Sequence, residues 1–346
     1  MSRQLKRLFC FFLYALGITP FLFRRIFKSG NPALVLLYHH ICKPGSPFEP
    51  AVPPAEFEKQ MRFMKKHFEL ISASELVTRI EKGRVSSRPA AVVSFDDGYR
   101  DNYEAAWPVL SRYGIPAIIF LATASIGTGE PIWTSRIDSL FRKTGASSLT
   151  LENLPGKKNF ELKDVYHRMK VSYEVKKEMK DVSDSRRQVI LQELEEKIGG
   201  SGAAEDETDE MLSWDEVRRL LEDPLIEIGS HTVTHRMLDH LEADEIKEEL
   251  LESKAKIEAE TGRKIDFLSY PGNSYNTTVL GVAREAGYRA AFAVDHGLTD
   301  FSQDRFALKR LHVQDEPIYV LLAEITLVLP AIRDWAARLK KGVIKR

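Results

Sequence analysis

The stretch Ala91–Gly98, which reads AVVSFDDG, decides the fold. Its short run of apolar and β-branched residues is too brief for a helix, and two aspartates and a glycine end it abruptly. The apolar residues occupy successive positions, which is typical of a parallel strand buried on both faces. Side chains at the end of such a strand lie where the active sites of parallel α/β proteins form.

Six further runs of the same kind lie along the chain, at Ala33–Ile41, Pro116–Ala122, Ile226–Ser230, Asp266–Tyr270, Ala290–Val294 and Ala307–Val313. Helical patterns separate most of these runs. Ser72 with Glu75, and Ser213 with Glu216, have the spacing of helix N-caps, and Gly114 and Gly287 are positioned as helix stops. The alternation predicts an α/β fold with a parallel sheet of seven strands.

One segment, at about residues 141–210, interrupts this alternation. It is rich in Lys and Glu, and it ends in glycines at 199, 200 and 202 and an acidic run from 205 to 210. A charged pattern of this kind usually forms a solvated face. We therefore predict a charged helical insertion that ends in a loose, irregular connection to the rest of the chain.

The composition limits the classes of function. The 346 residues are 43% hydrophobic, which supports a sizeable core and excludes wholesale disorder. Because 50 basic residues balance 50 acidic ones, the chain lacks the cationic excess of nucleic-acid-binding proteins, and no nucleic-acid partner is expected. The two cysteines, Cys10 and Cys42, provide neither a disulfide framework nor a cysteine-based zinc site.

The N-terminal segment Leu8–Phe23 carries no charge and has basic residues on both sides. At about 1.5 Å per residue it extends about 24 Å, less than the roughly 30 Å of a bilayer's hydrocarbon core. We predict that residues 1–30 form an apolar helix that anchors the chain as a short span or lies in the interface, whereas residues 31–346 form the α/β domain with its insertion. A buried core helix is the alternative, and the apolar run Ile318–Ile332 is interpreted as a last core helix.

Polar residues gather where the predicted strands end. Asp96 and Asp97 follow the second run, and His231 and His235 follow the fourth. Alone, Asp-Asp-Gly is an ordinary turn and two histidines four residues apart arise by chance. Together they provide a carboxylate and two imidazoles, which suit zinc or a related divalent ion with an open position. Gly98 lets the chain turn so that one aspartate can bind the metal while the other takes a proton from the attacking water.

These residues resemble the signatures of a known family, the polysaccharide deacetylases of carbohydrate esterase family 4, which share the NodB homology domain. Ser94–Gly98 is similar to its T/S-F-D-D-G motif and His231–His235 to its H-S/T-x-x-H motif, and the resemblance covers roughly residues 33–313. It implies a distorted (β/α)7 barrel that hydrolyses N-acetyl, less often O-acetyl, groups of sugars. It also implies that Asp96 is the general base and that Asp97, His231 and His235 hold the metal, with zinc expected first.

The sequence departs from the family pattern at two positions. Ser269 stands where the family's third motif often carries an arginine that orients the catalytic aspartate, and we expect Arg310 to provide that cation beside the substrate. His312 partly matches the general-acid histidine of the fifth motif. Tyr270 is expected to contact the substrate, near backbone N–H groups that could hold the oxyanion, with a buried aromatic in a turn as its alternative.

The leading hypothesis is a membrane-associated, metal-dependent deacetylase that acts on a polysaccharide or oligosaccharide of the cell envelope. Its expected partners are an acetylated glycan and a membrane surface. Two alternatives stay open: a deacylase of a lipid-linked sugar precursor, and a catalytically silent carbohydrate-binding barrel. The unligated aspartate argues against the silent barrel, because binding alone does not need it.

Overall fold

The computed structural model describes residues 3–28, 32–42, 48, 51–84, 88–199, 209–295, 297–299, 303–333, 335 and 338. All seven predicted strand segments form strands of one parallel sheet: β1 (Leu34–Tyr38), β3 (Ala90–Phe95), β4 (Ala117–Leu121), β7 (Ile226–Ser230), β8 (Phe267–Ser269), β9 (Ala290–Ala293), and the last segment as β10 (Leu308–Lys309) and β11 (Leu311–His312). A short strand that the sequence did not predict, β2 (Glu69–Leu70), pairs with β3.

The last segment closes the sheet into a barrel. The strand order is β10-β9-β8-β7-β4-β3-β1-β11, and β10 and β11 are separated by a single residue, Arg310. Lys309 lies in register with Ala293 of β9, whereas Leu311 lies in register with Leu36 of β1. One segment therefore joins both ends of the sheet, and the predicted distorted (β/α)7 barrel is confirmed.

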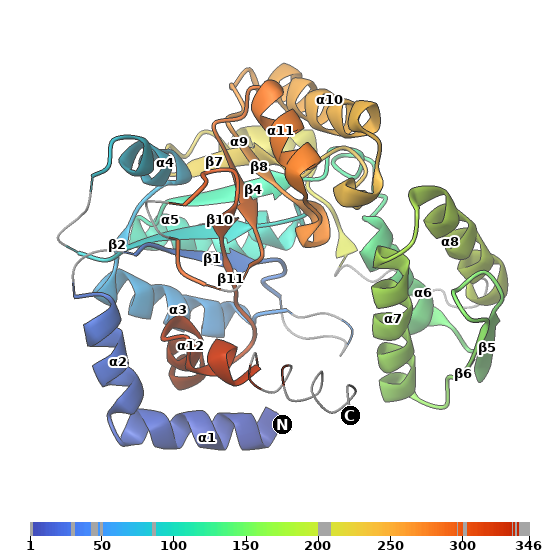
Figure 1. Ribbon diagram of the computed structural model, residues 1–346, viewed down its shortest axis with the longest axis horizontal. Helices are drawn as coiled ribbons and strands as arrows, with labels where there is room; N and C mark the ends of the chain where they lie inside the picture. Colours follow the sequence, from blue (N-terminus) through green and yellow to red (C-terminus); the bar gives the residue numbers. More distant parts are fainter. Residues whose placement is uncertain are drawn as a thin grey trace.

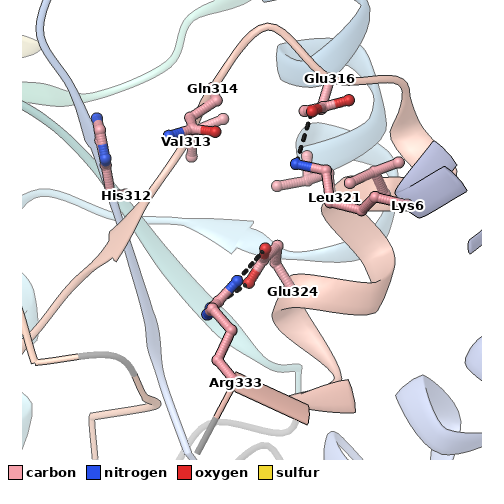
Figure 2. Close-up of a pocket in the computed structure, with 9 residues that line it drawn as sticks. Lys6, His312, Val313, Gln314, Glu316, Leu321, Glu324 and Arg333 are labelled. Carbon is pink, nitrogen blue, oxygen red and sulfur yellow. Dashed lines mark hydrogen bonds and ion pairs between the residues drawn. The ribbon is translucent and has the colours of Figure 1, made fainter. Parts of the chain in front are cut away.

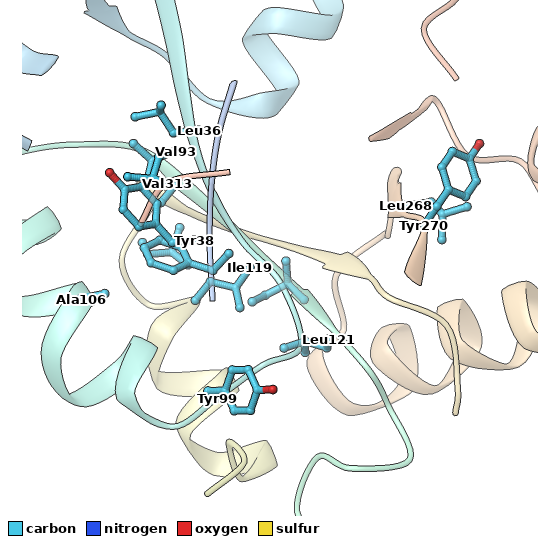
Figure 3. Close-up of a cluster of buried hydrophobic side chains, with 14 of the residues drawn as sticks. Leu36, Tyr38, Val93, Tyr99, Ala106, Ile119, Leu121, Leu268, Tyr270 and Val313 are labelled. Atoms are coloured by element: carbon cyan, nitrogen blue, oxygen red, sulfur yellow. The ribbon is translucent and has the colours of Figure 1, made fainter. Parts of the chain in front are cut away.

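Successive residues of each strand are buried on opposite faces, as the continuous apolar runs predict. Figure 3 shows Leu36, Val93 and Ile119, which come from three neighbouring strands and belong to the larger cluster shared with the surrounding helices. Val92 and Phe120, on the other face, belong to a smaller cluster that also includes residues of α4. The barrel is thus filled with side chains.

Helices connect the strands: α3 (Pro54–His67), α4 (Ala73–Glu81), α5 (Trp107–Tyr113), α9 (Trp214–Leu220), α10 (Ala243–Thr261) and α11 (Thr277–Glu285). A further helix, α12 (Ile318–Ile325), follows the last strand. The predicted N-caps are present, since Ser72 accepts from the Glu75 N–H and Ser213 forms a full capping box with Glu216. The helix α12 is buried, in agreement with its interpretation as a core helix.

The insertion begins earlier than expected and is not purely helical. It comprises α6 (Trp133–Lys143), an antiparallel hairpin of β5 (Ser148–Leu151) and β6 (Lys158–Glu161), α7 (Val165–Lys180) and α8 (Asp184–Ile198), and it lies to one side of the barrel in Figure 1. It has a hydrophobic cluster of its own. Its four-residue strands are too short to give a periodic signal, which is why the sequence missed them. Residues 200–208 of the predicted irregular connection lie outside the described residues.

The N-terminal segment forms two helices rather than one. The helices α1 (Arg3–Ala15) and α2 (Ile18–Ile26) meet at an angle of 72°, because Gly17 between them adopts a left-handed backbone with φ of 75°. No single described helix is long and apolar enough to cross a membrane. The bent pair α1 and α2, taken together, has the length and composition of a membrane-crossing segment.

Candidate active site

The end of β3 is a tight turn that directs two carboxylates to one buried place. Asp97 has a positive φ of 76°, and Gly98 follows with a φ of 86°. A side chain at Gly98 would meet Ile126 Cδ1 at 2.8 Å and Leu121 Cδ2 at 2.9 Å, so only glycine fits. As a result, Asp96 Oδ2 and Asp97 Oδ1 lie 3.8 and 3.3 Å from the same nitrogen, Nε2 of His231.

Asp97 and the two histidines form a buried three-ligand cluster. Asp97 Oδ1 lies 3.3 Å from His231 Nε2 and 3.5 Å from His235 Nε2, and one ligand atom from each residue lies within 4.8 Å of the others. Asp97 Oδ1 is buried and accepts no hydrogen bond from the described residues. One carboxylate and two imidazoles, with an unsatisfied buried oxygen between them, fit a divalent cation of the zinc type.

The protonation of these rings also suits metal binding. His231 Nδ1 lies 2.8 Å from the Ser269 carbonyl oxygen, which only accepts, so Nδ1 carries the proton and Nε2 is directed at Asp97. Burial lowers the pKa of His235 to about 3 against the opposing effect of Asp97, so this ring is neutral. Burial would lower the pKa of His231, but Asp96 and Asp97 outweigh it and raise this pKa. Burial would raise the pKa of Asp97, but the His231 ring in its protonated form outweighs it and holds the pKa of Asp97 below its usual range. A divalent cation would take the place of the proton on Nε2 of His231.

The loop that carries the histidines is strained and is held by a buried carboxylate of α10. Thr232 and His235 have positive φ values of 67° and 57°, which non-glycine residues seldom adopt. Glu249 of α10 accepts from the Val233 and Thr234 N–H groups at 2.8 and 3.0 Å. The sequence did not identify Glu249, because it is one of many charged residues on α10 and no motif marks it.

Asp96 is held by a buried ion pair. Arg310 donates from Nη1 and Nη2 to the two carboxylate oxygens, each at 2.7 Å, and Ser269 Oγ donates to Oδ2 at 3.0 Å. Burial would raise the pKa of Asp96, but Arg310 and His231 outweigh it and keep the pKa below its usual value. Asp96 is therefore an ionised carboxylate in a fixed orientation.

Arg310 was expected both to orient Asp96 and to contact the substrate, and the structure supports only the first. Its side chain is fully buried, and it also donates to Ser269 Oγ at 2.7 Å and to the Ala293 carbonyl at 3.3 Å. A guanidinium enclosed in this way has no face left for a sugar. Arg310 is a positioning residue, and the substrate-binding assignment is corrected.

Tyr270 does not extend a side chain into the site. It is fully buried, its hydroxyl donates to the Phe306 carbonyl at 2.9 Å, and its ring stacks on Tyr275. Figure 3 shows it beside Leu268, apart from the strands of the cluster's centre. The substrate-contact prediction for this side chain is wrong, because the turn after β8 points the ring into the core.

His312 ends β11 at the edge of the barrel where the carboxyl ends of the strands meet, which we call the barrel mouth. The centroid of its ring lies 5.1 Å from that of the His39 ring. It lines a pocket of about 330 Å³ together with Lys6 of α1 and Glu316, Leu321 and Arg333. Figure 2 shows the His312 ring on one wall and Lys6 on the opposite wall. His40, the other histidine of this region, is bound to Asp101 Oδ2 at 2.9 Å.

The insertion also reaches the site. Trp133 of α6 donates from Nε1 to the His235 carbonyl at 2.9 Å. Lys180 of α7 lies against the turn after β8, with Cε 3.7 Å from the place where Gly272 would carry a side chain, and burial lowers its pKa although Asp97 opposes this. Neither residue was predicted, because both lie far along the chain from the motifs.

Comparison with known proteins agrees with this geometry. A model of the family described as polysaccharide deacetylase matches residues 83–291. YxkH of Bacillus subtilis, which is named for the same family, is 23% identical over 289 residues, covering 83% of this chain and 74% of that protein. The poly-β-1,6-N-acetyl-D-glucosamine N-deacetylase of Staphylococcus epidermidis is 33% identical over 119 residues, 30% of this chain and 41% of that one.

Two solved structures share the fold. The deacetylase PplD of Streptococcus pyogenes, in complex with acetate, has a TM-score of 0.55 at 16% identity and covers 84% of this chain and 96% of its own. IcaB of Ammonifex degensii has a TM-score of 0.54 at 15% identity and covers 86% and 97%. At these identities the likeness shows that the barrel is the same.

Proposed function

Since the chain belongs to the polysaccharide deacetylase family, carbohydrate esterase family 4, we propose that it is a metal-dependent hydrolase that removes N-acetyl groups from a polysaccharide of the cell envelope. The observation that carries the proposal is the pair of neighbouring carboxylates with different partners. Asp97 Oδ1 lies unsatisfied between two imidazoles, whereas Asp96 is fixed by Arg310. A binding protein would have no use for this division, so it disfavours the silent barrel.

Asp97, His231 and His235 would hold the divalent ion, with zinc the first candidate because of its preference for nitrogen and carboxylate ligands. When bound there, such an ion supplies Lewis acidity toward the acetyl carbonyl and lowers the pKa of water. The Ser269 carbonyl holds the His231 ring in the tautomer that this requires.

Asp96 would act as the general base. Its carboxylate is ionised at neutral pH because Arg310 keeps its pKa low, and the bidentate contact fixes its orientation, with Oδ2 3.8 Å from Nε2 of His231. Proton transfer to a placed carboxylate then activates water for attack on the acetyl carbon.

His312 is the proposed general acid for the leaving amine. It is half-buried and stands on the strand that follows Arg310. Its ring centroid lies 5.1 Å from that of His39, whose pKa burial lowers although the Asp97 and Asp96 carboxylates oppose this. A neutral amine leaves far more readily than its anion, so the leaving nitrogen requires a proton donor beside it. Together Asp96 and His312 would provide the two proton transfers of amide hydrolysis.

The substrate we propose is a polymer of N-acetylglucosamine. The support is the Staphylococcus epidermidis relative, whose name gives poly-β-1,6-N-acetyl-D-glucosamine as its substrate and which is 33% identical over the 119 residues matched. That match spans less than half of the relative, so the linkage has to be tested directly.

The test is release of free acetate by the zinc-loaded full chain. We expect release from β-1,6-linked N-acetylglucosamine oligomers, lower release from β-1,4-linked ones, and little from O-acetylated glycans. Dialysis against a chelator should stop the reaction, and zinc should restore it. Equal turnover with and without metal would contradict the metal dependence, and binding of every oligomer without acetate release would favour the silent barrel.

A further inference from the structure

The outward face of the two N-terminal helices is a continuous apolar surface. Its members recur at helical spacing along α1 and the turn after it and continue on α2: Leu5, Leu8, Phe9, Phe12, Leu16, Ile18 and Phe21. Their exposed fractions range from 36% to 73%. We name this set the apolar stripe. A soluble monomer seldom exposes so many large apolar side chains together, so the stripe is a surface for binding.

The opposite face of α1 fixes the stripe's orientation. Lys6 and Arg7 each form an ion pair with Glu316 at 2.7 Å, and Cys10 is fully buried in a cluster with Val320 and Ala323 of α12. Figure 1 shows α1 at the outside of the molecule next to α12, and Figure 2 shows Lys6 directed at Glu316. The stripe therefore faces away from the barrel.

The charges carried by the two N-terminal helices are all of one sign. No acidic residue precedes Glu49 in a chain that is neutral overall. Arg24, Arg25 and Lys28, at the end of α2, are exposed and pair with no carboxylate in the described part of the chain. An apolar face with a cationic border matches a bilayer that contains anionic lipids.

We propose that α1 and α2 lie in the plane of an anionic bilayer, with the apolar stripe at the boundary between headgroups and acyl chains. With 13 and 9 residues and a bend of 72°, neither helix reaches the about 20 residues of a straight span. A second copy of the chain is a poorer occupant, since a twofold contact through α1 and α2 would bring two sets of Arg24 and Arg25 into one interface, and neither helix carries an acidic residue to pair with them.

The experiment measures flotation of the full chain with vesicles of phosphatidylcholine alone or mixed with phosphatidylglycerol. We expect binding to the anionic vesicles that weakens as salt increases. The double variant Phe12→Glu with Phe21→Glu should lower the affinity for these vesicles by about tenfold or more. Its matched control is Tyr166→Glu with Tyr173→Glu, which changes two exposed aromatics on α7 (69% and 70% exposed) and should bind like the wild type.

A second variant tests the charged border. Arg24→Gln with Arg25→Gln should weaken binding to anionic vesicles by about fivefold per cation and leave binding to neutral vesicles unchanged. Unaltered binding of the Phe12→Glu and Phe21→Glu variant, or no binding of the wild type to anionic vesicles, would overturn the proposal. So would native membranes that retain the protein after an alkaline carbonate wash, since that indicates a span.

The inference goes beyond the proposed deacetylase activity, because no residue of the stripe belongs to the candidate active site. Acetate release from a soluble oligomer separates the two. A variant that loses vesicle binding and keeps this activity supports docking alone, and a chain that binds vesicles but releases no acetate contradicts only the proposed function. Dimerisation that the Phe12→Glu and Phe21→Glu variant abolishes, without any vesicle binding, would assign the stripe to a second copy.

Discussion

The barrel mouth and the insertion both bury charged side chains, but they satisfy them differently. In the insertion, Asp138 accepts from Ser172 Oγ at 2.5 Å and pairs with Lys176, and Glu193 accepts from the N–H groups of residues 152 and 153 at 2.8 and 2.9 Å. At the mouth, Asp97 Oδ1 and His235 Nδ1 are buried and have no hydrogen-bond partner among the described residues.

This difference separates a structural charge from a functional one. A buried carboxylate whose acceptors are filled by the protein holds a loop or a helix in place, as Glu193 does for the turn after β5. A buried carboxylate that is left incomplete is costly unless a ligand completes it. Burial and charge alone would have marked both regions. The insertion also has buried polar atoms that make no hydrogen bond, such as Arg168 Nε and Glu195 Oε1, the latter ion-paired with Arg136. Among the described residues of the insertion, however, no three ligand atoms converge as those of Asp97 and the two histidines do at the mouth.

The largest expected effect comes from replacing one aspartate in each region. Asp96→Asn should lower kcat by about 10²–10⁴-fold, because the amide cannot take the proton. Asp138→Asn, its matched control in the insertion, should keep kcat near the wild-type value. Acetate release at saturating zinc measures both. A metal-loaded Asp96→Asn variant that turns over normally would remove Asp96 from the reaction.

The next effect is on stability. Arg310→Met leaves Asp96 buried with Ser269 as its remaining side-chain donor, and should lower the free energy of unfolding by about 3–5 kcal/mol. Urea unfolding followed by circular dichroism measures this. Arg187→Met, which removes a buried arginine of the insertion that is bonded to Asp184 at 2.7 Å, should also destabilise the chain but spare kcat in the folded fraction. Equal loss of kcat in both would contradict the positioning role.

Zinc should stabilise the mouth through its incomplete cluster. At a concentration about 100 times the Kd, zinc should raise the free energy of unfolding by about 2.7 kcal/mol. His235→Gln should abolish most of this gain, whereas His167→Gln, an exposed histidine of α7, should retain it. The midpoint of urea unfolding with and without zinc measures the effect, and an unchanged gain in His235→Gln would exclude this residue as a ligand.

The smallest effect is expected at Glu193, whose satisfied carboxylate should respond to pH. Burial would raise its pKa, but Lys197 and the two N–H groups outweigh it and lower the pKa to about 2. Its stabilisation is complete above the ordinary pKa and is lost as the pH falls toward 2. Glu193→Gln should therefore cost about 1–2 kcal/mol near pH 7, a difference that shrinks below about pH 4.5.

The matched variant for this prediction is Glu196→Gln, an exposed neighbour on α8. It should change neither the urea midpoint nor its dependence on pH. A difference between the wild type and Glu193→Gln that is constant from pH 7 to pH 2 would show that ionisation of Glu193 contributes nothing, and the comparison between the two regions would then rest on the mouth alone.

The sequence by itself determined the elements whose signal is local. Successive apolar residues predicted each barrel strand, and the positions of Asp96, Asp97, His231 and His235 at strand ends predicted one cluster, because the carboxyl ends of parallel strands meet at one edge. Capping pairs such as Ser213 and Glu216 needed only four neighbouring residues. Strands as short as β5 and β6 carry no such signal.

Only the tertiary structure decided what depends on contacts between distant residues. Strand order nominated Arg310, but its bidentate contact with Asp96, 214 residues away, and its complete burial follow from the closing of the barrel by β10 and β11. The same packing turned Tyr270 into the core and brought Trp133 and Lys180 to the site. A pattern in the sequence fixes which face of a strand or helix is apolar, but the direction of a long side chain depends on which neighbours fill the space around it.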